Sequence, residues 1–372
     1  MRFIRRIFGS TPSPIGVDFG SASLKLAQLD GVGIGARLIA AADYDVPDDV
    51  ARRPAARLQF FVSTIPELLS RGGFRGRRCV LGLPAASMHL ERVRIPVLDA
   101  ECSRQAIEHE ASLRLPFHTS RALIRHVVAG EVYEGDQPRS EVIVMATRRQ
   151  LIDELLTMAR RAQLEVVGFN AEPIALTRCF SAEGRTTRSG LPPGALMIVD
   201  IGSSASRVYI VARGKILFAR AVGIGAVQLD QSIADRLGIP LAEARAGRLE
   251  LSRLRSAADG NSSTGVHKPL SEKLARAEHA CLLTLRKLKA ELELSTRYFH
   301  ATFPSTHVED VVFIGGAAGH ARLCQVISEE VHLKYCAAAS LAGIDMQGDN
   351  PILTAAWAVA VGLTLADLKQ AA

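Results

Sequence analysis

Two short segments of the chain have a composition suited to binding phosphate and a divalent cation. In each segment an apolar run ends at an aspartate, Asp18 or Asp200, and a glycine and small hydroxyl residues follow before a second apolar run begins. This pattern predicts a β-hairpin with a tight turn. Backbone N–H and hydroxyl groups in the turn can donate to phosphate oxygens, and the aspartate can hold a hydrated Mg²⁺ ion. A single turn of this kind is common, but two copies favour two facing phosphate clamps.

The residues that follow each aspartate are the candidate phosphate ligands. They are Gly20, Ser21, Ser23 and Lys25 in the first segment, and Gly202, Ser203 and Ser204 in the second. Glycine lets the backbone approach an anion closely, and the lysine can balance phosphate charge unless its side chain faces solvent. The two aspartates have an alternative role, because an aspartate also caps a turn by hydrogen bonding to its own backbone.

A third glycine element lies towards the end of the sequence. Gly315, Gly316 and Ala317 follow the apolar run 311–314 and precede a helical pattern. Small residues at this position allow the backbone to pass close beneath an adenosine, although a purely structural turn would have the same composition. The order of two phosphate turns and a nucleoside turn resembles the actin-like ATPase superfamily, which includes Hsp70 and the sugar kinases.

Composition limits the classes of protein to which the chain can belong. Its 372 residues allow about two to three domains, and 48% hydrophobic residues support large cores. The net charge of +7 comes from an excess of arginine, but few aromatic residues lie among the basic ones, so nucleic-acid binding is not expected. None of the six cysteines belongs to a C-x-x-C pair, and no apolar run is long enough for a membrane span. We therefore expect a cytoplasmic protein without a zinc or disulfide scaffold.

Hydrophobic periodicity predicts the strands and helices that must position these turns. Strands are expected at 79–83, 89–95, 122–133, 141–147 and 165–169, and helices at 58–69, 100–113, 148–163 and 272–302. Segment 48–165 is therefore interpreted as a small α+β unit inserted after the first turn. The remaining segments are a basic tail that is either frayed or lies on a membrane surface (1–13), a linker (181–194) and an exposed loop (259–269).

The insertion and several short motifs resemble the PilM family, which comprises actin-like cytoplasmic proteins of bacterial type IV pilus assembly. The motifs are Arg77–Pro84 followed by Val93–Pro96, Ala106–Glu110 followed by Leu115–Phe117, Glu172–Ala175, and Asn350–Ala356 up to Gly362. The resemblance covers residues 14–366, and the order and spacing of the motifs are more specific than any one of them. It implies an α/β fold of the actin-like, ribonuclease H-like type, with two halves around a nucleotide cleft and an inserted subdomain of the FtsA/PilM type.

This fold implies a division of the chain after the basic tail. The expected parts are the first half of the core, subdomain 1A (14–47), the inserted 1C-like subdomain (48–165), the return to 1A with the linker (166–194), the second half with subdomains 2A and 2B (195–330), and the end of that half with a closing helix that returns to 1A (331–372).

The resemblance also implies ligands and partners. The expected cofactors are ATP and Mg²⁺, and the expected partner is the cytoplasmic N-terminal peptide of a PilN-like inner-membrane protein. Further expected partners are other inner-membrane pilus components and copies of the same chain in a homo-oligomer or ring. Through its partners, the protein would be attached peripherally to the inner membrane. A groove around Val93, Ile95, Ile107 and Leu113 is a candidate site for the peptide, and plain core packing is the competing interpretation.

Further residues receive roles from the same resemblance. Glu172 stands where the superfamily begins its connecting helix, a place from which a carboxylate can position the attacking water. A carboxylate there can equally complement the helix dipole. Glu243 and Arg248 lie on a polar helix and would contact the ribose and base, although the family tends to place a lysine near 248. Ser203 replaces a glycine of the Hsp70-type turn, so any hydrolysis of ATP is expected to be slow.

Two other functions are open at this level. A small-molecule kinase of the same superfamily would need a substrate pocket with its own carboxylate base, for which Glu172 is the candidate. A scaffold that binds no nucleotide is suggested by the serine at position 203.

Overall fold

The computed structural model describes residues 12–31, 36–51, 53–180, 194–259, 270–336 and 355–366. Most of the predicted basic tail and linker, the loop predicted after residue 259, and the start of the closing motif at Asn350 lie outside these residues.

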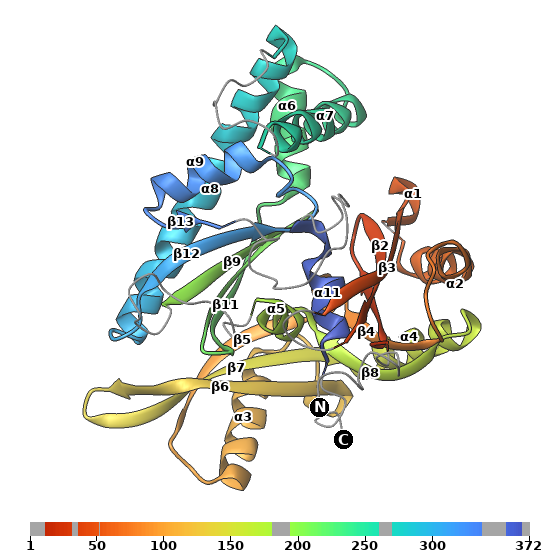
Figure 1. The fold of residues 1–372 in the computed structure, drawn as a ribbon. Coiled ribbons are helices and arrows are strands. Elements are labelled where there is room, and N and C mark those ends of the chain that lie inside the picture. The colour runs from red at the N-terminus through yellow and green to blue at the C-terminus, as the bar shows by residue number, and fades with distance from the viewer. Residues whose placement is uncertain are drawn as a thin grey trace, which may run out of the picture.

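The core consists of two five-stranded sheets with the same strand order (Figure 1). The first has the order β3-β2-β1-β4-β8 and the second the order β11-β10-β9-β12-β13. In each sheet, adjacent strands among the first three of this order are antiparallel. The last two strands run parallel to the central strand. The strands are β1 Ile15–Phe19, β2 Ser23–Asp30, β3 Arg37–Asp45, β4 Arg78–Leu83, β8 Glu165–Ala171, β9 Ala195–Ile201, β10 Ser206–Ala212, β11 Lys215–Val222, β12 Val308–Ile314 and β13 Lys334–Tyr335. The chain thus contains two copies of one α/β topology.

The central strands of both sheets are almost entirely buried. Every residue of β9 is buried, and β2 is buried from Leu24 to Leu29. Helices cover both faces of each sheet, so a strand such as β9 carries a nearly continuous apolar run rather than an alternation of apolar and polar residues. The stiff apolar runs on either side of Asp18 and Asp200 have this origin.

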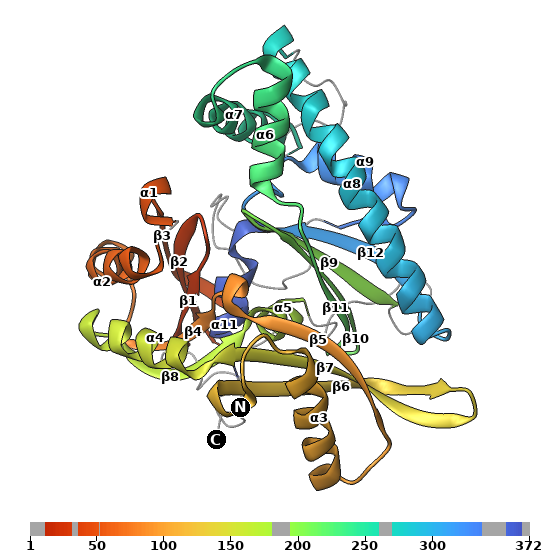
Figure 2. The same ribbon diagram turned by 180° about the vertical axis from the view of Figure 1, so that it is seen from behind.

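Two helices lie between the sheets (Figures 1 and 2). α5 (Glu172–Cys179) and α11 (Ala358–Thr364) share one buried cluster with apolar side chains of both sheets. The helices cross closely, because a Cβ at Gly362 would lie 2.1 Å from the carbonyl oxygen of Ala175. Only a glycine at this point lets α11 dock against α5.

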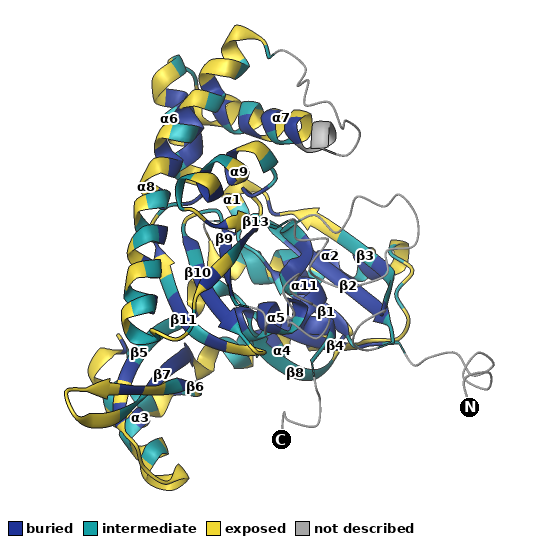
Figure 3. Ribbon diagram, turned by 60° about the vertical axis from the view of Figure 1, so that its left-hand side comes forward, coloured by how far each residue is buried: buried dark blue, intermediate teal, exposed yellow. Residues whose placement is uncertain are grey.

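The remaining helices of the two halves cover the outer faces of the sheets. α2 and α4 pack on the first sheet, and α6, α8 and α9 pack on the second, while α7 extends from this group with an exposed outer face (Figure 3). Their bounds are α2 Pro54–Arg71, α4 Arg149–Arg161, α6 Ala226–Leu237, α7 Leu241–Asp259, α8 Glu272–Thr302 and α9 Ala321–Glu330. Among the described segments, no helix combines the length and apolarity needed to cross a bilayer.

A separate three-stranded sheet, in the order β5-β7-β6, carries α3 on one face. Its elements are β5 His89–Pro96, α3 Ala100–Arg114, β6 Ala122–Glu134 and β7 Gln137–Arg148, and we call residues 89–148 the inserted unit. This unit is narrower than the predicted insertion 48–165. α2 and α4 pack on the first sheet, and β4 pairs in parallel with β1 because its buried apolar run suits a central strand.

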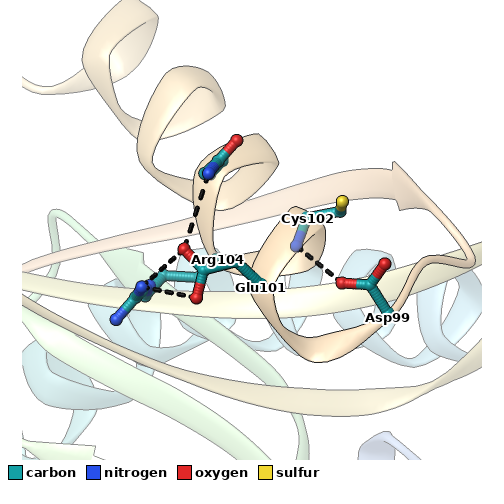
Figure 4. A network of polar contacts seen from close by, with 5 residues as sticks. Asp99, Glu101, Cys102 and Arg104 are labelled. Atoms are coloured by element: carbon teal, nitrogen blue, oxygen red, sulfur yellow. Dashed lines mark hydrogen bonds and ion pairs between the residues drawn. The ribbon is translucent and has the colours of Figure 1, made fainter.

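A side-chain cap fixes the start of α3 (Figure 4). The Asp99 carboxylate accepts a hydrogen bond of 2.9 Å from the backbone N–H of Cys102, and Glu101 forms an ion pair of 2.6 Å with Arg104. The cap satisfies an N–H group that the first turn of a helix leaves without an intrahelical partner.

The face of the inserted sheet that lies opposite α3 packs against the second half. Arg92 of β5 lies over the rings of Phe218 in β11 and Tyr298 in α8, with its guanidinium carbon 4.6 and 3.9 Å from the ring centroids. Gly130 of β6 approaches Phe303, where a Cβ would lie 2.9 Å from the ring. The inserted unit therefore belongs to the first half by chain connection and contacts the second half by packing.

We expect Gly362→Ala to destabilise the protein, because the added methyl group would lie 2.1 Å from the Ala175 carbonyl oxygen and force α11 away from α5. Overpacking of this kind lowers the free energy of unfolding by about 1–3 kcal/mol, which urea denaturation can measure. Gly247→Ala is the matched control, since Gly247 also lies in a helix but has no atom within 4 Å of an added Cβ. That variant should be unchanged or more stable by up to about 1 kcal/mol. Equal destabilisation of both variants would contradict the close crossing.

Candidate functional site

The two predicted turns occupy equivalent positions in the two sheets. Asp18 lies in β1 and its turn leads into β2, and Asp200 lies in β9 and its turn leads into β10. The strand register places Lys25 opposite Asp18 and Arg207 opposite Asp200. In both hairpins a carboxylate therefore faces a cation that follows it by seven residues.

Three carboxylates from the two halves converge between these turns. Burial raises the pKa of Asp18 to about 6, against the lowering effect of Lys25 and with support from Glu172. Burial also raises the pKa of Asp200 well above its usual range, and the negative charges of Glu172 and Asp18 add to this effect. The pKa of each aspartate is therefore affected by a carboxylate from elsewhere in the chain. This requires that the fold bring the two turns close together.

Glu172 is the first residue of α5 and is held in place by the second sheet. The hydroxyl of the buried Tyr209 in β10 donates a hydrogen bond of 2.9 Å to Glu172 Oε1. Burial, and then the charge of Glu172, raises the pKa of Tyr209, so the phenol stays protonated and remains a donor. Glu172 also lies close enough to Asp200 for its negative charge to raise the pKa of that aspartate. The orientation of Glu172 is thus set by a small polar network.

The cations opposite the aspartates are close to the carboxylates rather than in solvent. Lys25 is 9% exposed and donates to Ser23 Oγ, which excludes the interpretation that it faces solvent. Arg207 places Nη1 at 3.9 Å from Asp200 Oδ2. Arg207 and Tyr209 were not among the predicted site residues, although the equal spacing of both aspartate–cation pairs was a signal for Arg207.

Glycines let backbone segments approach this group of carboxylates. A Cβ at Gly315 would lie 2.2 Å from Asp200 Oδ1, and Gly315 has a φ of +93°, which side-chain-bearing residues rarely adopt. Gly20 and Gly202 make their turns tight, because a Cβ there would lie 2.7 and 2.8 Å from a carbonyl oxygen of the same turn. The third glycine element therefore lies directly against the second aspartate.

Gly316 and Ala317, the next two residues of the third glycine element, differ in their exposure to solvent. Gly316 is exposed and has no atom within 4 Å of an added Cβ. Ala317 is buried, and its N–H donates to the carbonyl oxygen of Ile201 at 3.2 Å. The inner side of the element is thus attached to β9, and the space beside Gly316 is open, as an adenosine above it would require.

The hydroxyl residues of both turns are accessible. Ser21 and Ser203 are partly exposed, and Ser204 is exposed. The second turn is anchored from behind, because the N–H of Ala226 at the start of α6 donates to the carbonyl oxygen of Gly202 at 2.9 Å. This arrangement leaves the serine hydroxyls available to a ligand.

Glu243 and Arg248 have other partners in the structure than a nucleoside. Arg248 is buried, and its Nε and Nη2 donate to Asp230 of α6 at 2.5 and 3.3 Å. Glu243 is exposed on α7 and forms an ion pair with Lys273 of α8. Contact with a ribose or base would require each side chain to give up its ion pair. The contact of both side chains with a nucleoside therefore stays a prediction.

The residues predicted to line a partner groove are mostly core. Val93, Ile95 and Ile107 are buried between the inserted sheet and α3, whereas Leu113 is 67% exposed near the end of α3. The competing interpretation of core packing therefore holds for the first three residues.

An open cavity of about 530 Å³ lies at the edge of the inserted unit. Side chains of β5, β7 and α3 line it, and Tyr298 of α8 borders it from the second half. Two of its arginines are paired within the cavity, Arg94 with Glu141 at 2.8 Å and Arg139 with Glu134 at 3.3 Å. Its volume lies in the range of ligand pockets. The concave surface at this edge is mostly polar, in contrast to the predicted apolar groove.

The aspartates fit a hydrated magnesium ion better than a metal enclosed by protein ligands. The described segments contain no group of three or more side chains placed to ligate a metal directly. In the same segments, neither Asp18 nor Asp200 accepts a hydrogen bond from its own turn, as turn capping would require. Mg²⁺ keeps several waters and binds through one or two carboxylates together with phosphates, which two aspartates on facing turns can provide.

Comparison with known proteins agrees with this architecture. A family model described as type IV pilus assembly protein PilM matches residues 16–368. A chain of a solved PilM-PilN type IV pilus biogenesis complex is similar, with a TM-score of 0.72 and 20% sequence identity over 95% of this chain and 98% of that chain. The ethanolamine utilization protein EutJ from Carboxydothermus hydrogenoformans is similar with a TM-score of 0.55 and 14% identity, over 97% of this chain and 93% of that one. The expected actin-like α/β fold is confirmed.

We expect Asp18→Asn to stabilise the ligand-free protein at pH 8. The folded-state pKa of about 6 lies above the unfolded value of about 3.9, so this carboxyl group contributes stability below about pH 4 that is lost as the pH rises through 6. Asparagine does not ionise, so the variant does not lose this stability as the pH rises. The free energy of unfolding should rise by about 1–2 kcal/mol at pH 8, and the difference should shrink towards pH 4.

Urea denaturation at a series of pH values measures this difference. The control is Asp136→Asn, at an exposed position between β6 and β7, which should show no such pH dependence. An Asp18→Asn protein that is less stable than the native one at pH 8 would refute the unfavourable burial of this charge.

Proposed function

The chain belongs to the PilM family of type IV pilus assembly proteins, and on this basis we propose that it binds ATP with Mg²⁺ between its two halves and a PilN-like inner-membrane partner through the inserted unit. The observation that supports nucleotide binding is the convergence of Asp18 and Asp200 from two equivalent hairpins. The protein would act on the cytoplasmic side of the inner membrane, as a peripheral component attached through its partner.

The phosphate groups of the nucleotide would lie between the two turns. Their donors would be the backbone N–H and hydroxyl groups of Gly20, Ser21, Ser23, Gly202, Ser203 and Ser204. Lys25 and Arg207 provide positive charge close to both turns. Bound Mg²⁺ supplies neutralisation of phosphate charge, and Asp18 and Asp200 would hold it through water molecules. The adenosine would lie against Gly315, Gly316 and Ala317, on the side where no atom lies within 4 Å of a Cβ added at Gly316.

Glu172 would position a water molecule for attack on the terminal phosphate. The hydroxyl of Tyr209 fixes the orientation of its carboxyl group by a hydrogen bond. Turnover should be slow, because the Ser203 side chain limits how closely the second turn approaches the phosphates.

The inserted unit offers a route by which a nucleotide could affect partner binding. It is covalently part of the first half, and it packs on β11 and α8 of the second half through Arg92. Any rotation of one half against the other must therefore change this contact or move the inserted unit. Tyr298 of the second half borders the polar cavity. The same rotation would therefore change the contacts of a partner segment bound there.

Isothermal titration of ATP with Mg²⁺ tests the nucleotide proposal. We expect the native protein to bind, and Asp18→Ala and Asp200→Ala to weaken binding by about tenfold or more, because each removes a carboxylate that holds the cation. Asp136→Ala, at an exposed turn far in sequence from both hairpins, should bind like the native protein. Equal affinity in all four proteins would remove these aspartates from the site, and no binding by the native protein would favour a nucleotide-free scaffold.

The coupling can be tested with Arg92→Ala and a peptide that has the N-terminal cytoplasmic sequence of the PilN-like partner. In the native protein, Mg²⁺-ATP should change the dissociation constant of the peptide several-fold. In the variant this change should disappear, since the cation–π contacts, about 0.5–2 kcal/mol each, no longer join the inserted unit to the second half. Arg125→Ala, which removes an exposed arginine of the same sheet, should leave the nucleotide effect intact. An undiminished effect in Arg92→Ala would exclude this route.

A further inference from the structure

Arg57, near the start of α2, reaches the first hairpin turn from an outer helix. Its Nη2 donates to the carbonyl oxygen of Gly20 at 3.1 Å, so the guanidinium lies at the glycine of the proposed phosphate turn. Its guanidinium carbon lies 5.6 Å from the ring centroid of Phe61 on the same helix, and this contact supports the side chain in that position.

The charge of Arg57 is not balanced within the part of the chain that the structure describes. Burial lowers the pKa of Arg57, and no carboxylate of the described segments forms an ion pair with it. Its Nε is buried and lacks a hydrogen-bond partner among the same residues. A cation withdrawn from water is normally paired with an anion, because an unpaired one is strongly unfavourable. Arg57 is partly exposed, so its guanidinium retains a charge that an anion from outside the described chain can match.

The other cations at the two turns do not show this imbalance. Lys25 lies opposite Asp18 in the strand register, and Arg207 lies 3.9 Å from Asp200. Each of these pairs contains one positive and one negative group. Arg57 is thus the cation at the first turn that has no carboxylate partner in the described residues and is available to an anionic ligand.

We propose that Arg57 is a specificity-determining residue that binds the terminal phosphate of the nucleotide and selects the triphosphate over the diphosphate. This inference rests on the nucleotide binding proposed above. A guanidinium has five N–H donors in a planar fork, so Arg57 can keep its bond to Gly20 and present other donors to phosphate oxygens. The group that it matches is an anion with several acceptor oxygens, and a terminal phosphate at the first turn has that chemistry.

Equilibrium binding of ATP, ADP and adenosine to the native protein and to Arg57→Ala, each with Mg²⁺, tests the proposal. Loss of a charge-assisted hydrogen-bonded pair should weaken ATP binding by about 10- to 100-fold. The loss for ADP should be smaller, and the affinity for adenosine should not change. Arg57→Lys should recover part of the ATP affinity, because an ammonium group still offers charge but not the planar fork.

Two further variants separate phosphate binding from a structural role. Arg57→Met keeps an apolar stem against Phe61 and should reproduce the Arg57→Ala profile even if alanine loosens α2. Arg53→Ala is the matched control, because Arg53 adjoins the same helix but is exposed and paired with Asp49 at 2.9 Å. It should leave all three affinities unchanged.

The possible outcomes divide clearly between the two proposals. Unchanged ATP affinity in Arg57→Ala and Arg57→Met, or an equal loss for ATP, ADP and adenosine, would overturn the role of Arg57 while nucleotide binding stands. Absence of ATP binding by the native protein would overturn nucleotide binding and the role of Arg57 together. A selective loss of ATP affinity in both variants supports the proposal.

Discussion

The gathering of three carboxylates between the two sheets is the constraint on which the rest of the structure depends. Asp18, Glu172 and Asp200 come from the two sheets and from the helix between them, and their burial and proximity raise the pKa of both aspartates. Such a group is unfavourable for folding, and it persists because the surrounding packing leaves the side chains no alternative position. Carboxylates with strongly perturbed pKa values cluster at functional sites, although structural ion-pair networks also perturb pKa values. In the proposed complex, a divalent cation with phosphate would offset the negative charge of these carboxylates.

The repeated topology explains how the carboxylates come to face one another. Identical strand order puts Asp18 and Asp200 at equivalent places in the two central strands, and α5 and α11 set the separation of the sheets. Because Gly362 lets α11 cross close to α5, a small displacement of α11 would move one aspartate relative to the other. The geometry of the site is therefore controlled by apolar packing that does not itself touch a ligand.

Two arginines show how the surroundings of a cation decide what it does. Neither Arg92 nor Arg57 has a carboxylate partner in the described segments, but their neighbours differ. Arg92 lies over two aromatic rings, which compensate part of its desolvation and make it a link between the inserted unit and the second half. Arg57 has a single ring and one carbonyl oxygen as neighbours, and its Nε is left without a partner. Arg92 likewise has one buried nitrogen without a partner, Nη1, so it is the position of Arg57 at the first turn that suits it to an added anion.

The sequence by itself determined the local features: both hairpins, the glycine and serine residues of their turns, and helices such as 272–302. These follow from hydrophobic period and from residues that a tight turn requires, which are properties of neighbouring positions. Only the tertiary structure decided that Arg207 faces Asp200, that β4 belongs to the first sheet, and that Arg248 is paired with Asp230. Each of these depends on strand register or on a helix elsewhere in the chain, and a local pattern contains no information about which distant residue will lie opposite.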